Sequence, residues 1–119
     1  MDQSNVVLRY RDGRTERASI VDIDAERQSV AVTHDASNAE VPFAVLKAIF
    51  FPRAGAEDEM ETATGSTIAV EFADGEVIRG IAHYNPERNG FFLFPLDRSK
   101  NDRIFVVNSA IVSIEVEKL

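Results

Sequence analysis

Two Asp-Gly pairs constrain the fold of this chain more than any other feature. The stretch LRYRDGRTERA begins at Leu8 and the stretch VEFADGEVIRG begins at Val70, and in both the pair follows alternating apolar and polar residues. Asp-Gly beside such alternation is the strongest short-range hairpin signal, because a type I′ turn needs positive φ at both central positions. The sequence therefore predicts two β-hairpins of the same kind.

The two hairpins belong to a longer internal similarity. A shift of 62 residues places Asp12-Gly13 on Asp74-Gly75, and three more residues in a later loop of the second half place Ile49 on Ile114. The order and spacing of the turn signals agree as well as the apolar pattern does, which favours a duplication. Chance similarity between two β-rich halves is the alternative.

Each half contains five short stretches typical of β-strands, and five short strands in so few residues are typical of a small barrel. The predicted fold is therefore all-β, with two tandem five-stranded small barrels packed together and little helix beyond short turns near 43–46 and 108–110. The first barrel repeat covers 1–51 and the second covers 67–119. Between them, 52–66 (PRAGAEDEMETATGS) has the composition of an exposed acidic linker, with a short helix over 56–62 as the alternative.

Several predicted strands are apolar on both faces. Phe50 and Phe51 are neighbours in one strand, and Phe92 and Phe94 share a strand with large apolar residues between and beside them. A small barrel has room inside for one face of each strand, and exposed Phe side chains are costly and adhesive. These four Phe residues are therefore the candidate interaction surface, through which the halves pack on each other or on another subunit. Cover by the linker or loops is the alternative.

Composition limits the class of protein. The 119 residues include no cysteine, which excludes disulfides, thiolate catalysis and cysteine-ligated zinc. No apolar run is long enough to cross a bilayer, and the N-terminus has no basic region followed by an apolar one. A cytoplasmic protein is expected. The formal net charge of −7, concentrated in the linker, argues weakly against a partner held mainly through phosphates.

The sequence contains no recognisable catalytic or metal-binding constellation. His34 and His83 have no second ligand at metal-binding spacing, and no nucleophile elbow, glycine-rich dinucleotide fingerprint or P-loop occurs. We therefore expect no catalytic residue, no cofactor and no metal, and a protein that is not an enzyme.

A basic cluster is the candidate for nucleic-acid contact. It consists of Arg9, Arg11, Arg14 and Arg17, around the first Asp-Gly pair. Asp12 and Glu16 interrupt it, so a solvated strand face with cross-strand charge pairs is the alternative. RNA binding through this face is the second function that the sequence suggests.

The order of the elements resembles the Sm-like small barrel. The resemblance rests on the Asp-Gly hairpin, the following apolar strand and the run IFVVNSAIVSIEV, and it covers 68–116 and, more weakly, 6–51. It implies a bent five-stranded sheet that ends in a strand, a tight turn and a closing strand. The residues by which RNA-binding Sm proteins contact RNA do not match, since Asn108-Ser109-Ala110 stands where they have Arg-Gly or Lys-Gly.

The chain is also similar to an uncharacterised bacterial family of tandem small-barrel modules. The matching motifs are LKAIFF, which begins at Leu46, and GFFLFP, which begins at Gly90. This resemblance implies an accessory module in bacterial signalling or secretion, without an activity. PilZ barrels, which bind a cyclic dinucleotide, are a poor match because the chain has no RxxxR pair. The sequence as a whole therefore predicts a non-enzymatic interaction or regulatory module that binds a protein partner or itself.

Overall fold

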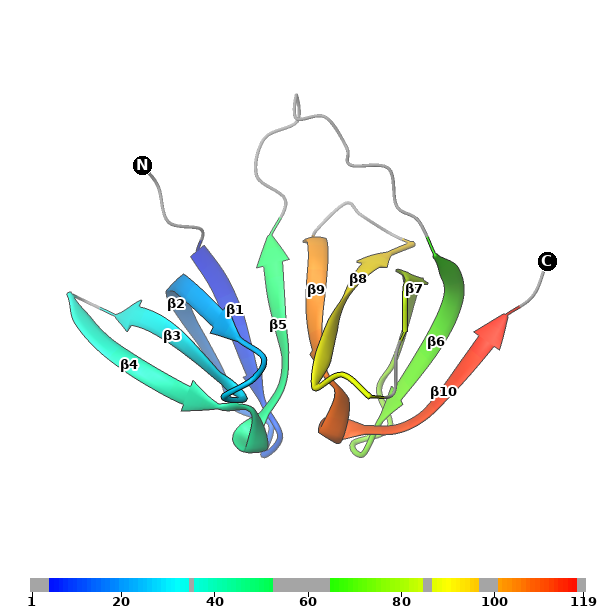
Figure 1. Ribbon diagram of the computed structural model, residues 1–119, viewed down its shortest axis with the longest axis horizontal. Coiled ribbons are helices and arrows are strands. Elements are labelled where there is room, and N and C mark those ends of the chain that lie inside the picture. The colour runs from blue at the N-terminus through cyan, green and yellow to red at the C-terminus, as the bar shows by residue number, and fades with distance from the viewer. Residues whose placement is uncertain (1–4, 35, 53–64, 85–86, 97–100, 118–119) are drawn as a thin grey trace, which may run out of the picture.

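A computed structural model describes residues 5–34, 36–52, 65–84, 87–96 and 101–117. Most of the predicted acidic linker, including the alternative helix over 56–62, lies outside the described residues. Ten strands and two single-turn 3₁₀ helices account for nearly all of the described chain (Figure 1). The strands are β1 (Asn5–Tyr10), β2 (Thr15–Asp24), β3 (Ser29–His34), β4 (Ser37–Pro42), β5 (Leu46–Pro52), β6 (Ser66–Phe72), β7 (Val77–Ala82), β8 (Gly90–Pro95), β9 (Asn101–Val107) and β10 (Ile111–Glu117). The 3₁₀ helices are η1 (Phe43–Val45) and η2 (Asn108–Ala110). The all-β prediction is confirmed.

The described strands form one antiparallel sheet in the order β10-β6-β7-β8-β9-β5-β1-β2-β3-β4. The expected pair of closed barrels is not observed, and the sheet is not closed. A strand has only two edges, and β5 uses one for β1 and the other for β9, so it has none left with which to close on β4. Figure 1 shows β5 and β9 side by side in the middle, with the other strands of the first half on one side and those of the second half on the other.

The two halves bury opposite faces of this shared sheet. Across the centre, Leu8, Ile49 and Phe105 are register partners on one face, which is the interior of the first half. The next row is shifted by one residue, points to the other face and includes Phe50 and Ile104. On that face the interior of the second half lies against β8 and β9. The central strand β5 is therefore buried on both faces, which explains its apolar run from Ala48 to Phe51.

One hydrophobic core connects the halves. The buried apolar residues form a single cluster that runs from β1 to η2, and the rings of Phe43 in η1 and Phe105 in β9 lie 5.7 Å apart. The Cα radius of gyration is 14.0 Å, close to the roughly 13.5 Å expected for one compact unit of this length. The chain therefore folds as a single body.

The two Asp-Gly turns have the same backbone geometry. Gly13 and Gly75 have φ values of 98° and 92°, and each donates its N–H to the carbonyl three residues earlier. Neither aspartate has positive φ, so the predicted type I′ turn is wrong. The observed loop is one residue longer, with glycine alone in the left-handed region, as in a type I turn followed by a bulge. Both turn types need glycine at this place, so Asp-Gly signals both.

Candidate functional site

A β-bulge in β5 re-aims one polar side chain toward the second half. The pairing with β1 passes from Arg9↔Ala48 to Tyr10↔Leu46, which leaves Lys47 as the extra residue. A bulge turns its extra side chain away from the regular alternation. Lys47 is only 5% exposed, although it is charged. Its position at the junction of the halves is therefore set by the irregularity in the strand.

Lys47 fastens the second Asp-Gly turn to the first half. Its Nζ donates a hydrogen bond to Asp74 Oδ2 at 2.7 Å and another to Glu76 Oε1, and it lies 4.9 Å from the centre of the Phe72 ring. Arg9 Nη1 also donates to Glu76 Oε1, at 3.0 Å. The bond from Lys47 and the backbone N–H of Glu76 hold the pKa of the Asp74 carboxyl below its ordinary value. Both carboxylates of the turn thus have cationic partners across the junction.

Arg11 makes a second link between the halves. Its Nε and Nη2 donate to the carbonyls of Leu46 and Phe43 at 2.9 and 3.0 Å, and Nη2 also donates to Ser109 Oγ at 2.5 Å. Beside it is a hollow of about 150 Å³, which Lys47 and Asp74 also line. These charged groups already bond one another, the backbone or Ser109, so the hollow lies at the junction of the halves with its charges paired.

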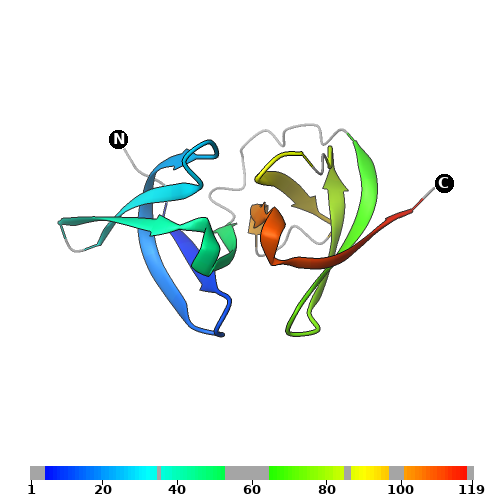
Figure 2. The ribbon, with the colours of Figure 1, turned by 60° about the horizontal axis from the view of Figure 1, so that its bottom comes forward.

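The last strand, β10, has a bulge at the same place as β5, but its second edge is unpaired among the described strands. β10 pairs with β6, first through Ile111↔Phe72 and then through Ser113↔Glu71, so that Val112 is the extra residue. Val112 is 62% exposed, and Val116 further along the strand is 51% exposed. Among the described residues no strand pairs with the other edge of β10. Figure 2 shows β10 at one outer end of the molecule and the β3–β4 hairpin at the other.

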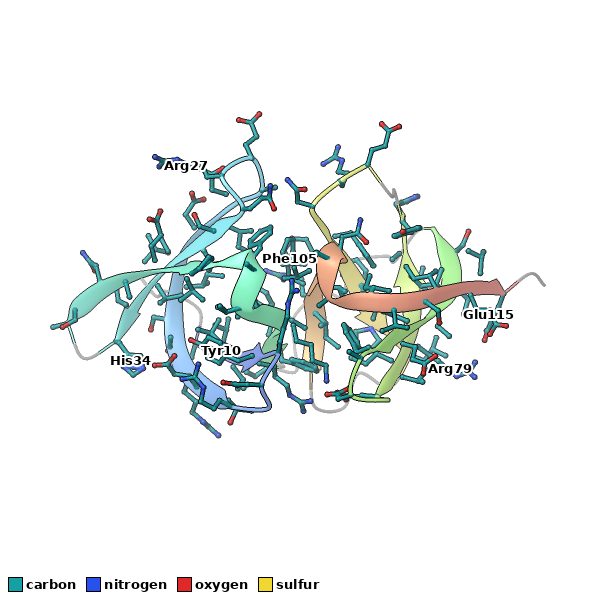
Figure 3. All side chains as sticks on the ribbon, turned by 90° about the horizontal axis from the view of Figure 1, so that it is seen from below. Tyr10, Arg27, His34, Arg79, Phe105 and Glu115 are labelled. Atoms are coloured by element: carbon teal, nitrogen blue, oxygen red, sulfur yellow. The ribbon has the colours of Figure 1, made fainter. Side chains whose placement is uncertain are left out.

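The two faces of β10 differ in chemistry. Ile114 and Val116 pair with Val70 and Ile68 of β6, whose side chains are fully buried, so this row lies on the core side. The alternate row contains three glutamates. It consists of Ser113, Glu115 and Glu117 on β10 opposite Glu71, Ala69 and Thr67 on β6. Glu117 accepts a hydrogen bond from Arg79 Nη1, and Glu71 accepts one from Ser113 Oγ at 3.3 Å. Figure 3 shows Arg79 and Glu115 at this end of the molecule.

The four Phe residues of the predicted interaction surface differ in their exposure to solvent. Phe50 and Phe51 are buried in the junction because β9 pairs with β5 over them. Phe94 is half-buried, and Phe92 is 38% exposed. The Phe92 ring packs 5.8 Å from Phe51 and 5.2 Å from Phe105, and the guanidinium of Arg103 covers both Phe51 and Phe92. Only Phe92 still presents a large part of its ring to solvent.

The four arginines of the predicted basic face do not form one free patch. Arg9 bonds Glu76 and stacks over the Phe50 ring at 4.5 Å, and Arg11 bonds the junction. Arg14 forms a 2.8 Å ion pair with Asp12, the residue two before it, and lies over the Tyr10 ring. Arg17 is exposed at the edge of a hollow in the first half. Three of the four guanidinium groups are thus engaged within the chain.

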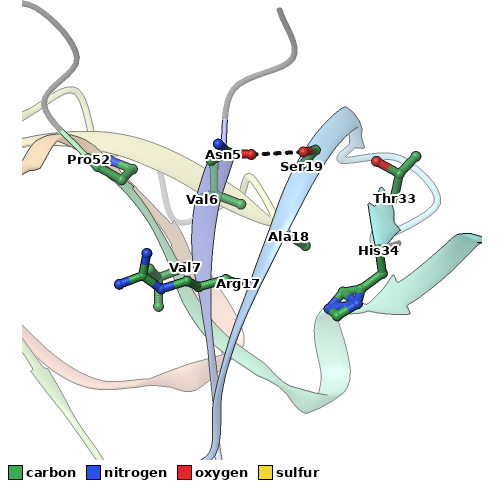
Figure 4. Close-up of a pocket in the computed structure, with 9 residues that line it drawn as sticks. All are labelled: Asn5, Val6, Val7, Arg17, Ala18, Ser19, Thr33, His34 and Pro52. Carbon is green, nitrogen blue, oxygen red and sulfur yellow. Dashed lines mark hydrogen bonds between the residues drawn. The ribbon is translucent and has the colours of Figure 1, made fainter. Parts of the chain in front are cut away.

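That hollow has a volume of about 330 Å³ and lies over β1, β2 and β3. Arg17 and His34 line it from opposite sides of β2 (Figure 4). Its Ser19 hydroxyl donates to Asn5 Oδ1 at 2.9 Å and so is not paired with the histidine as a nucleophile would be with its base. The serine of this hollow is therefore not an activated nucleophile.

Beside the hollow, one carboxylate joins two titratable groups. Glu16 Oε1 accepts a hydrogen bond from the Tyr10 hydroxyl at 2.6 Å, and Glu16 Oε2 lies 3.1 Å from His34 Nε2. Burial, the hydrogen bond and the negative charge of Glu16 raise the pKa of Tyr10 to about 12. The Tyr10 hydroxyl is thereby held in its protonated form and serves as a hydrogen-bond donor.

Within the described ranges, no group of three or more histidine, aspartate or glutamate side chains is placed to hold a metal ion. His83, the second histidine considered from the sequence, is exposed. No helix in the part of the chain that the structure describes is long and apolar enough to cross a membrane.

Lys47 and Val112 were not among the residues predicted from sequence. A signal for both was present, since the alignment that places Ile49 on Ile114 also places Lys47 on Val112. A charged residue inside the apolar run LKAIFF marks a place where burial needs a partner. Val112, at the same place in the second half, is apolar and needs no charged partner.

Comparison with known proteins assigns the chain to an uncharacterised family. The model of the Family of unknown function (DUF6982) matches residues 2–118. The chain therefore belongs to this family, in agreement with the expected membership of an uncharacterised family. No curated protein and no solved structure matches significantly.

Proposed function

We propose that this protein is a non-enzymatic interaction module that binds a protein partner at the open end of the sheet formed by β10. One observation carries the proposal. β5 and β10 have the same bulge and follow the same kind of 3₁₀ turn, but only β5 has strands at both edges: β9 pairs with its second edge, and no described strand pairs with the second edge of β10. An uncovered edge strand with exposed valines is adhesive, and proteins usually cover or charge such edges. Val112 and Val116 are the residues through which the partner is held.

The module is built, in this proposal, from two copies of one Sm-like five-stranded unit. The matching glycine φ values, turn hydrogen bonds and bulges support a duplication. The first copy is completed by the second, because β9 pairs with β5 where a neighbouring unit would otherwise sit. The second copy has no such neighbour within the described chain, and its last strand is available for a different protein.

The charge pairing supports a binding role over a catalytic one. The buried cation Lys47 and the carboxylates of Asp74 and Glu76 neutralise one another across the junction. Catalytic groups need a reacting atom within reach and a partner that activates them. The polar groups of the two hollows mostly bond one another or the backbone, which suits a rigid scaffold.

Nucleic-acid contact through the Arg9–Arg17 face is the second candidate and has less support, because three of its four guanidinium groups have intramolecular partners. Titration with single-stranded RNA at low and moderate salt tests it directly. We expect no binding that weakens with salt. A steep salt dependence that is lost in Arg17→Ala would favour this candidate instead.

The proposed function is tested by capture from a lysate of the source organism with three baits. These are the wild-type chain, the double variant Val112→Ser/Val116→Ser, and the control Val21→Ser on β2, where Val21 is 53% exposed. A partner retained by the wild type and the control but lost from the double variant is expected. Equal capture by all three baits, or no capture by any at near-native protein concentration, would contradict the proposal. Circular dichroism of each bait verifies that it is folded.

A further inference from the structure

We propose that the partner adds an extended segment to β10 as the next antiparallel strand, with a basic residue beside Glu115 and apolar residues on either side of it. This inference rests on the proposed function and specifies the chemistry of the partner. The argument uses the backbone of β10, its two faces and the covered counterpart β5.

The backbone of β10 is suited to strand addition. Its seven residues pair with β6 alone among the described strands, so half of its N–H and C=O groups point to an open edge. The same position in the first half shows what such an edge accepts. β9 pairs with β5 antiparallel over four consecutive residues, from Ala48↔Val106 to Phe51↔Arg103. We therefore assign the same antiparallel direction to the segment on β10.

The core-side face of β10 needs apolar residues from that segment. Ile114 and Val116 point to the side of the second-half core but are only partly covered. In the covered junction the corresponding face of β5 meets large apolar side chains of β9, such as Phe105 beside Ile49. The bulged Val112, between the paired residues Ile111 and Ser113, adds another exposed apolar side chain to the strand.

The opposite face of β10 needs a cation. Glu115 and Glu71 lie on this face without an ion pair to any other described residue, whereas Glu117 is bonded to Arg79. A lysine or arginine of an added strand lies next to Glu115 when its flanking residues lie over the apolar row, because strand side chains alternate. Glu71, on the far side of β10, adds negative charge to the same face. The chain itself carries a net charge of −7, which also attracts a basic segment.

A second copy of the chain fits this edge poorly. In the first half, β4 corresponds to β9, and its outer edge is free among the described strands. If β4 of a second copy paired with β10 as β9 pairs with β5, Glu40 would lie opposite Ile114 and Ala39 opposite Glu115. A carboxylate would then lie on the apolar face, and Glu115 would gain no cation. In an antiparallel pair of two β10 strands, the registers centred on Glu115 or Val116 set glutamates opposite one another, which is destabilising. The register centred on Ile114 sets Glu115 opposite Ser113 and supplies no cation.

The test uses capped peptides as long as β10 with the wild-type chain. The probe alternates valine and lysine. One control alternates valine and glutamate, and another is the valine-lysine peptide N-methylated along one edge. We expect the probe to bind and to shift the backbone amide resonances of β10 and not those of β4. Both control peptides should bind more weakly, since one repels Glu115 and the other lacks the N–H groups that a ladder needs.

Two charge-reversal variants locate the interaction. Glu115→Lys should weaken the valine-lysine peptide about fivefold to tenfold and strengthen the valine-glutamate peptide. Glu40→Lys, at the other edge of the sheet, changes the net charge equally and should leave both affinities nearly unchanged. Equal effects of the two variants, shifts that map away from β10, or equal binding of the N-methylated peptide would overturn the inference.

The remaining outcomes separate this inference from the proposed function. If the probe does not bind while lysate capture still depends on Val112 and Val116, strand addition is wrong and the binding module stands. If capture also fails, both are wrong. Sedimentation that shows a dimer of the free chain, abolished in Glu115→Lys, would identify a second copy as the occupant and overturn the inference.

Discussion

The strands β5 and β10 occupy the same place in the two halves, and their differences show what covering a strand requires. β5 (LKAIFFP) is buried at every residue but the last, whereas no residue of β10 (IVSIEVE) is fully buried. Their core-side isoleucines, Ile49 and Ile114, correspond. On the other face Ala48 and Phe50 of β5 are replaced by serine and glutamate in β10. The strand with neighbours at both edges is apolar on both faces, and the strand with a neighbour at one edge has a polar face in contact with water.

The bulged residues show the same contrast in electrostatic terms. Lys47 is buried because Asp74 and Glu76 of the neighbouring half receive its charge. Val112 stands at the corresponding place and is exposed. A buried lysine without acceptors would be costly, so its presence marks a permanent neighbour. A valine at the open end can be exposed or covered, as a reversible interaction needs.

Truncation of the two core-side isoleucines should give the largest difference in stability between β5 and β10. Ile49→Ala should lower the free energy of unfolding by about 2–5 kcal/mol, because Ile49 is fully buried between both halves. Ile114→Ala, at the partly covered position, should cost less than about 1.5 kcal/mol. Urea denaturation monitored by circular dichroism measures both values. Equal losses would show that β10 is packed as fully as β5.

Replacement of each bulged residue by methionine should give the next largest difference in stability. Lys47→Met should lower the free energy of unfolding by about 1–3 kcal/mol, since two carboxylates lose the ammonium that bonds them. Val112→Met should change it by no more than about 0.5 kcal/mol. A Lys47→Met protein as stable as the wild type would show that the ion pairs do not hold the halves together.

The two Asp-Gly turns provide a matched control. Gly13→Ala and Gly75→Ala should each cost about 1–2 kcal/mol, because alanine is strained at the positive φ of both sites. An added Cβ would meet no atom within 4 Å at either glycine, so conformation alone sets the cost. Thermal unfolding should therefore show similar shifts for the two variants. A large difference between them would mean that the turns are not equivalent.

The smallest expected effect is a change in the titration of one aspartate. Hydrogen bonds lower the pKa of both Asp12 and Asp74, but Arg14 is the partner of Asp12 and Lys47 is the leading partner of Asp74. Lys47→Met should raise the pKa of Asp74 toward its ordinary value and leave that of Asp12 unchanged, as carboxyl NMR can show. Because the folded-state pKa of Asp74 is depressed, its stabilising contribution is present above the ordinary value of 3.8 and is lost as the pH falls further. An unchanged Asp74 titration would contradict the Lys47 contact.

Local sequence signals predicted the strands and turns well. The arrangement of the strands depends on contacts between distant residues, which such signals do not contain. The Asp-Gly hairpins and the short turns near 43–46 and 108–110 are present as expected. The turn type was wrong because glycine satisfies two loop geometries. The apolar faces of LKAIFF indicated a neighbour, but only the pairing of β5 with β9 shows that this neighbour prevents closure. The partner of Arg9 is Glu76, 67 residues away, which no local pattern reveals.

Amide hydrogen exchange of β5 and β10, with and without the valine-lysine peptide, tests the central claim most directly. In the free chain the amides of β5 should be protected along the whole strand, whereas in β10 only those directed toward β6 should be, with the alternate amides exchanging rapidly. Addition of the peptide should protect these alternate amides of β10 and leave β5 unchanged. Full protection of β10 in the free chain, or no change on addition of the peptide, would contradict the account.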